Sequence, residues 1–158
     1  MKGNPKVIDA LNEALHEELT AINQYFLHAE MCENWHYDHL GGLIKKQSIG
    51  EMKHAEVLIE RILFLDGTPN LTKPIAVTIG KNVKEQIESD LKLEVEAVGM
   101  YNRAIETARE EGDNASRELF ERLLKDEEEH VDWLEAQVHQ MKELGYERYL
   151  SQQINGEG

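Results

Sequence analysis

The feature that most constrains this chain is a pair of Glu-x-x-His motifs, Glu51 with His54 and Glu127 with His130. On a helix, this spacing places a carboxylate and an imidazole on one face, one turn apart. Such pairs arise easily by chance in a glutamate-rich sequence, so the motif alone decides little. What sets these two apart is that a lone glutamate precedes each of them by 33 residues. We therefore expect long helices around both motifs.

A single offset of 76 residues relates the two halves of the chain. The residues that obey it form four pairs: Glu18 and Glu94, Glu51 and Glu127, His54 and His130, Tyr25 and Tyr101. The glutamates and histidines are residue types that bind metal ions. Scattered surface charge has no reason to follow one translation, so we interpret these residues as two halves of a duplicated site.

The composition favours a helical, acidic protein of one domain. A chain of 158 residues can bury a full core, and it contains only three prolines. Its formal net charge of -14 argues against nucleic acid or an anionic membrane as partner and favours cations. Cys32 is the only cysteine, which excludes an internal disulfide. Without a signal-like start or a membrane-spanning stretch, we expect a cytoplasmic protein.

The apolar pattern predicts four long helices and one short helix in a single domain, 1–158. Apolar residues recur every three or four positions, and the helices are expected at about 4–34, 38–65, 82–111, 114–144 and 146–154. The six acid and imidazole residues fall on the apolar stripes, where an unpaired charge would be costly. The short segment cannot fold alone and is expected to pack only between subunits.

The connection at residues 68–81 is too long for a simple turn between neighbouring helices, and it contains Pro69, Pro74 and Gly80. About 15 extended residues reach roughly 50 Å at most. A helix of about 27 residues is near 40 Å long. We therefore predict a crossover that leaves the second and third helices parallel.

Antiparallel pairing of the first two helices brings Glu18 opposite Glu51, because both lie at similar distances from the turn. Glu94 and Glu127 meet in the same way in the second hairpin. Packing the hairpins together places four carboxylates and two imidazoles in one layer, which resembles the site of ferritin-like di-iron and di-manganese bundles. Four carboxylates balance two divalent cations, and this donor set suits iron or manganese. Buried Glu–His pairs without metal are the alternative.

The chain resembles the bacterioferritins over essentially its whole length. The matching segments are residues 1–3, 21–29, 51–55, 59–65 and 130–135. The resemblance implies a ferritin-like four-helix bundle with a short fifth helix that assembles into a hollow 24-mer. It also implies that the ferroxidase ligands are two bridging glutamates, two terminal glutamates and two histidines: Glu51 and Glu127, Glu18 and Glu94, His54 and His130.

Four other positions follow from the resemblance. Met52 matches the methionine that binds haem b between two subunits, an arrangement that requires a two-fold dimer. A methionine there could equally fill an interface. Tyr25 matches a tyrosine linked to electron donation, although a core tyrosine bonded to a ligand carboxylate is the alternative. Lys46 and Gly50 stand where better-known members carry His and Asp, so we do not expect an inner-surface iron site.

These features predict iron storage and detoxification. The expected reaction is oxidation of Fe(II) to Fe(III) by oxygen or hydrogen peroxide at a di-iron centre, followed by deposition of ferric mineral inside the assembly. A ferredoxin-type electron donor is one candidate partner for iron release. The alternatives are a di-iron oxygenase or peroxidase without mineral storage, which requires a pocket beside the metals, and a purely structural or metal-buffering bundle.

Overall fold

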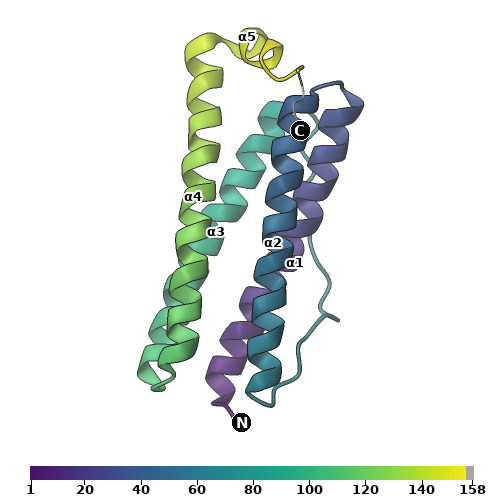
Figure 1. Ribbon diagram of the computed structural model, residues 1–158. Helices are drawn as coiled ribbons and strands as arrows, with labels where there is room; N and C mark the ends of the chain where they lie inside the picture. The colour runs from purple at the N-terminus through teal and green to yellow at the C-terminus, as the bar shows by residue number, and fades with distance from the viewer. Residues whose placement is uncertain (156–158) are drawn as a thin grey trace.

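The computed structural model describes residues 1–155, which form an all-α bundle with no strand in that range (Figure 1). Its elements are α1 (Pro5–Asn34), α2 (Asp38–Phe64), α3 (Val83–Glu110), α4 (Asn114–Leu144) and α5 (Tyr146–Ser151). The ends of each long helix lie within one residue of the range expected from the sequence. The short helix α5 ends at Ser151 instead of 154. None of the helices in the described range has the apolar length needed to cross a membrane.

Local side-chain chemistry explains where α3 begins and α4 ends. The side chain of Asn82 accepts a hydrogen bond from the Glu85 N–H at 2.9 Å, as an N-cap should. The Glu85 carboxylate accepts from the N–H of Lys81 at 2.8 Å, one residue before the position that a regular capping box would use. Gly145 follows α4 with φ +83, a conformation that favours glycine.

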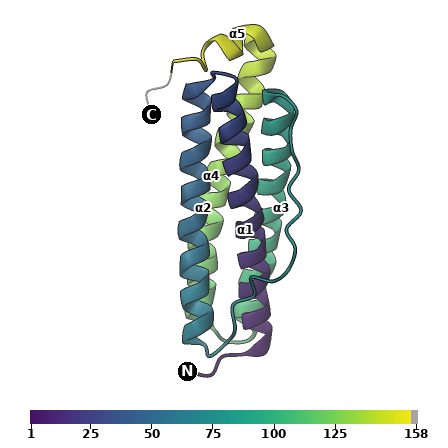
Figure 2. The same ribbon diagram turned by 90° about the vertical axis from the view of Figure 1, so that its right-hand side faces the viewer.

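The bundle consists of two antiparallel hairpins, α1 with α2 and α3 with α4 (Figures 1 and 2). Its interior contains two separate apolar clusters, and each receives side chains from all four long helices. One cluster includes Leu15, Leu58 and Phe120, while the other includes Ile44 and Leu134. The predicted ligand residues lie in the layer between the clusters. Burial of apolar surface at both ends therefore positions the polar layer in the middle.

The segment between α2 and α3 runs along the length of α1 (Figure 2), so α2 and α3 are parallel, as predicted. It is attached to α1 by hydrogen bonds at successive levels. The bonded residues are Asn12 with Thr68, His16 with Pro74, Gln24 with Thr78 and His28 with Gly80. Each of these bonds satisfies a backbone group of the crossover that has no partner in regular secondary structure.

A buried polar network holds the end of the crossover that leads into α3. His28 Nε2 accepts from the Gly80 N–H at 3.0 Å, so the proton is on Nδ1, which donates to Asp90 Oδ1 at 2.9 Å. Gln24 donates to the same oxygen at 2.9 Å. A Cβ at Gly80 would lie only 2.4 Å from the backbone nitrogen of Gln86, so glycine is required there.

The helix α5 docks on its own chain at the end of the bundle (Figure 1). Tyr149 is fully buried and its hydroxyl donates to Gln137 Oε1 at 2.7 Å. The N–H of His39 also donates to the carbonyl of Gln153 at 3.0 Å. The expectation that this segment packs only between subunits was therefore wrong. It did not account for the large aromatic side chain, which reaches the apolar cluster of its own bundle.

Candidate metal centre

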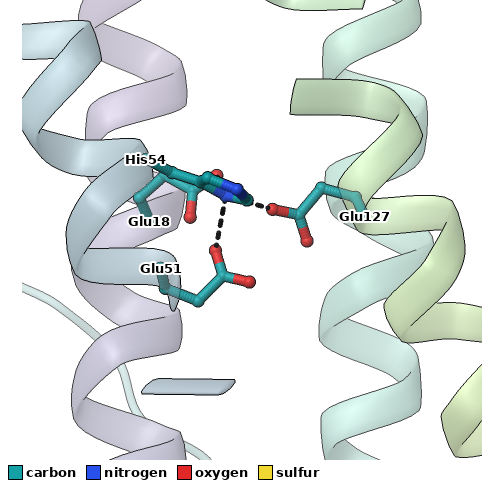
Figure 3. A group of neighbouring side chains, drawn as sticks. All are labelled: Glu18, Glu51, His54 and Glu127. Atoms are coloured by element: carbon teal, nitrogen blue, oxygen red, sulfur yellow. Dashed lines mark hydrogen bonds and ion pairs between the residues drawn. The ribbon is translucent and has the colours of Figure 1, made fainter. Parts of the chain in front are cut away.

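All six predicted ligands meet in the polar layer of the bundle. Each long helix contributes to the set: α1 provides Glu18, α2 provides Glu51 and His54, α3 provides Glu94, and α4 provides Glu127 and His130. The four glutamates are at most 2% exposed. Figure 3 shows four of these residues, with the His54 ring joined by dashed lines to the carboxylates of Glu51 from α2 and Glu127 from α4. Ordinary glutamates avoid such burial, so the layer needs a chemical explanation.

The donor atoms fall into two overlapping groups. The group that we name the His54 subsite consists of Glu18, Glu51, His54 and Glu127. The group that we name the His130 subsite consists of Glu51, Glu94, Glu127 and His130. Within each group, one donor atom from every residue lies within 4.8 Å of the others. Two glutamates therefore belong to both subsites, and each subsite has one glutamate and one histidine of its own.

The shared glutamates direct their two oxygens at different imidazoles. Glu51 places Oε2 at 3.3 Å from His54 Nδ1 and Oε1 at 2.8 Å from His130 Nδ1. Glu127 places Oε1 at 3.0 Å from His54 Nδ1 and Oε2 at 3.4 Å from His130 Nδ1. A carboxylate that presents one oxygen to each of two adjacent positions has the geometry of a bridging ligand.

The two unshared glutamates each face one imidazole, at 3.5 Å in both subsites. A tyrosine from the opposite half of the chain holds each of them. The hydroxyl of Tyr101 donates to Glu18 Oε1 at 2.5 Å, and the hydroxyl of Tyr25 donates to Glu94 Oε1. Both tyrosines are fully buried. The structure thus places Tyr25 as a hydrogen-bond partner of a candidate ligand carboxylate.

Several buried polar atoms of this layer have no hydrogen-bond partner in the described chain. They are Glu18 Oε2, both oxygens of Glu51, Glu94 Oε2 and His130 Nδ1. Each such atom costs about 1–3 kcal/mol if nothing else binds it. Although Glu51 Oε1 and His130 Nδ1 are 2.8 Å apart, neither is aligned for a hydrogen bond with the other. These donor atoms converge on two common positions instead of bonding to one another, as the ligands of two divalent cations would. The donor set suits iron or manganese.

The crowded carboxylates favour protonation of both imidazoles. Burial opposes the charged form of His54, but the nearby carboxylates of Glu127 and Glu51, 3.0 and 3.3 Å from Nδ1, outweigh it and raise its pKa to about 11. The same balance, with Glu94 added, raises the pKa of His130 to about 12. Burial and the neighbouring Glu127 raise the pKa of Glu94 as well. Both imidazoles must lose a proton before Nδ1 can bind a cation, so cation binding at neutral pH releases protons.

Asp126 is a contact of the candidate ligand His54 that the sequence analysis missed. Its Oδ2 lies 3.0 Å from Nε2 of His54, on the side of the ring away from the other carboxylates. The 76-residue offset could not single it out, because the equivalent residue in the first half is Gly50. Its position directly before Glu127 was the only available signal.

The other predicted positions lie outside the layer. Met52 is 55% exposed on the outer face of α2, where Ile49 is also exposed. Lys46 is exposed, and a Cβ at Gly50 would meet no atom within 4 Å. Neither Lys46 nor Gly50 belongs to the two donor groups formed by the described residues.

The fold and the donor geometry together define a class of protein, the four-helix bundles with a paired-cation carboxylate site. Residues 8–144 match the family model described as a ferritin-like domain. The chain is 44% identical over 155 residues to the bacterioferritin of Mycolicibacterium paratuberculosis, with 98% of each chain covered. It is 47% identical over 149 residues to the bacterioferritin of Brucella melitensis, covering 94% of this chain and 92% of the relative. This protein therefore belongs to the bacterioferritins, within the ferritin-like family.

Proposed function

We propose that this protein is a ferroxidase that stores iron. In the proposed reaction, Fe(II) bound at the two subsites is oxidised to Fe(III) by oxygen or hydrogen peroxide, and ferric mineral collects inside a hollow 24-mer. The observation that carries the proposal is the division of the Glu51 and Glu127 oxygens between two imidazoles. Such bridging holds two substrate ions side by side, so two electrons are available to one oxidant molecule.

Each group of the layer has a defined part in this proposal. Glu51 and Glu127 bind both ions, while Glu18 and Glu94 each bind one and are held in place by a tyrosine hydroxyl. The imidazoles complete each subsite. Four carboxylates match the charge of two ferrous ions, so the loaded layer places no net formal charge between the apolar clusters. The Tyr25 hydroxyl is hydrogen-bonded to Glu94, and we propose that this tyrosine supplies an electron to the reaction.

The space beside the ligands favours small substrates over an organic molecule. The space between the ligands is lined by residues that include all four ligand glutamates, and it leaves no room for a water-sized molecule. Pockets that hold organic ligands are typically about 300–1,000 Å³. The oxygenase alternative therefore requires more room beside the ligands than the described residues leave.

Rapid mixing of the metal-free protein with Fe(II) and oxygen tests the proposal. We expect the first two Fe(II) per chain to be oxidised at least about 10-fold faster than in buffer, with further iron then retained as mineral. Repeating the reaction with hydrogen peroxide identifies the preferred oxidant. A rate equal to that of buffer would support the metal-buffering alternative, and oxygen consumption coupled to an organic product would support the oxygenase.

The proposal extends to the assembly. Large apolar side chains remain exposed on this chain, including Phe26, Leu63 and Ile79, which are 55%, 57% and 55% exposed. Exposed apolar surface of this kind is commonly covered by subunit contacts. We propose that residues 1–158 act as a single domain and assemble into a cytoplasmic homo-oligomer of 24 chains. A ferredoxin-type protein is the proposed electron donor for iron release.

We further propose that Met52 binds haem b at a two-fold interface. Met52 and Ile49 are 55% and 47% exposed, one turn apart on the outer face of α2. A thioether at such a position can provide one axial ligand, and a two-fold partner provides the other. Neither of these side chains is needed to fill the core of the single chain.

Met52→Leu is expected to abolish haem binding and leave the rate of Fe(II) oxidation unchanged, because leucine has no sulfur ligand and residue 52 points away from the layer. The measurement is the Soret absorption of protein purified with haem available. Met100→Leu is the matched control, since Met100 is 2% exposed in the core and should not affect haem. Equal Soret absorption in the Met52 variant and the parent protein would contradict the assignment.

A further inference from the structure

We infer that the two subsites bind cations with unequal affinity. The His54 subsite is the tighter one, because the Asp126 carboxylate contacts Nε2 of its imidazole, the ring nitrogen that faces away from the other carboxylates. The inference rests on the proposed metal centre and adds to it an order of loading. It also assigns Asp126 as a positioning residue, which acts on the cation only through His54.

The first observation is the pair of contacts that His54 makes. Its Nδ1 faces the carboxylates of its subsite, and its Nε2 lies 3.0 Å from Asp126 Oδ2. When Nδ1 binds a cation, the ring proton must be on Nε2, where it donates to Asp126. A carboxylate in this position fixes the tautomer and the ring orientation, and it strengthens the imidazole as a donor.

The second observation is that His130 lacks this support. The offset that relates His54 to His130 also relates Asp126 to Gly50, which has no side chain. Three carboxylates pair with the His130 ring in the described residues, and all of them approach Nδ1. Within residues 1–155, no hydrogen bond to His130 Nε2 is present. The His130 side chain is also more exposed than that of His54, at 19% against 10%.

The remaining parts of the two subsites are matched. The bridging glutamates are common to both, and each subsite has one further glutamate bonded to a buried tyrosine. The contrast between Asp126 and Gly50 is therefore the main chemical difference between them. Loss of such an outer partner typically lowers metal affinity about 10- to 100-fold. We expect a difference of that size between the two subsites of the same chain.

Titration of the assembled, metal-free protein with Co(II), followed by its visible absorption, tests the inference. The parent protein should bind two Co(II) per chain in two steps whose affinities differ about 10- to 100-fold. Asp126→Ala should weaken the tight step by a similar factor, and Asp126→Asn should partly restore it because the amide oxygen still accepts from Nε2. Glu129→Ala is the charge-matched control, because Glu129 is exposed on the same helix and pairs with neither imidazole.

The reverse substitution provides an independent test. Gly50→Asp should tighten the weak step, because it gives His130 the partner that Asp126 gives His54, and a Cβ at this position meets no atom within 4 Å. Gly50→Ala controls for the change in helix propensity. Two equal steps in the parent protein, or a tight step unchanged by Asp126→Ala, would overturn the inequality and leave the paired site intact. A chain that binds no Co(II) would overturn both this inference and the proposed function.

Discussion

Glu127→Ala is expected to remove rapid Fe(II) oxidation, lowering the initial rate by about 100-fold or more. Glu127 is shared by both subsites, and its oxygens lie 3.0 Å and 3.4 Å from the two imidazole Nδ1 atoms. Its loss removes one ligand from each ion and the bridge between them. Stopped-flow absorption of the Fe(III) product measures the rate. Glu18→Ala and His130→Ala, which each affect one subsite, should also remove the rapid phase because the reaction needs both ions.

Glu128→Ala is the control for this experiment. Glu128 is exposed and adjacent in sequence, but it is not part of either subsite, so this variant should oxidise Fe(II) at the parent rate. Circular dichroism should show that the Glu127 variant remains helical, since the change removes one of four crowded carboxylates. A helical Glu127→Ala protein with the parent rate would mean that oxidation takes place elsewhere.

Asp90→Ala is expected to produce the largest loss of stability, about 3–5 kcal/mol per chain, because it leaves two buried donors unpaired and each costs about 1–3 kcal/mol. His28 and Asp90 are 0% and 1% exposed, and Gln24 also donates to the same carboxylate oxygen. Alanine leaves both donors unpaired and weakens the attachment of Gly80 through His28. Thermal unfolding measures the loss as a lower Tm, and limited proteolysis within residues 68–81 shows whether the crossover loosens first.

Asp90→Asn separates the hydrogen-bond network from the charge. The asparagine carbonyl can accept from His28 and Gln24 as Oδ1 does now, and its amide replaces Oδ2, which has no hydrogen-bond partner in the described chain. Burial already raises the pKa of Asp90 and so favours its neutral form. We therefore expect asparagine to cost much less than alanine. If both variants lose the same stability, the charge and not the network is the stabilising element.

The positions of the six candidate ligands could be predicted from the sequence because helical spacing and hairpin symmetry determine them. Glu18 and Glu51 meet because they lie at similar distances from one turn, and the 76-residue offset repeats that relation in the second hairpin. Helix ends were predictable for a similar reason, since residues such as Asn82 and Gly145 stop or start a helix locally. Both arguments depend on distances along the chain.

Contacts that depend on tertiary packing could not be predicted in this way. The pair of His28 and Asp90 joins residues from different hairpins, and no repeat in the sequence links them. Asp126 was missed because its importance lies in the side of the His54 ring that it contacts, which requires the crossing of α2 and α4. The packing of Tyr149 within its own chain likewise depends on a gap at the end of the bundle that spacing rules do not describe.

The separation of the core into two apolar clusters has a consequence for how such proteins can change. Each cluster ties together all four long helices, so either end of the bundle can keep them aligned without help from the polar layer. Substitutions in that layer can then alter which ion is held, or whether any is held, with the architecture preserved. The same division offers protein engineers a scaffold in which the polar layer can be redesigned while the two apolar clusters are left unchanged.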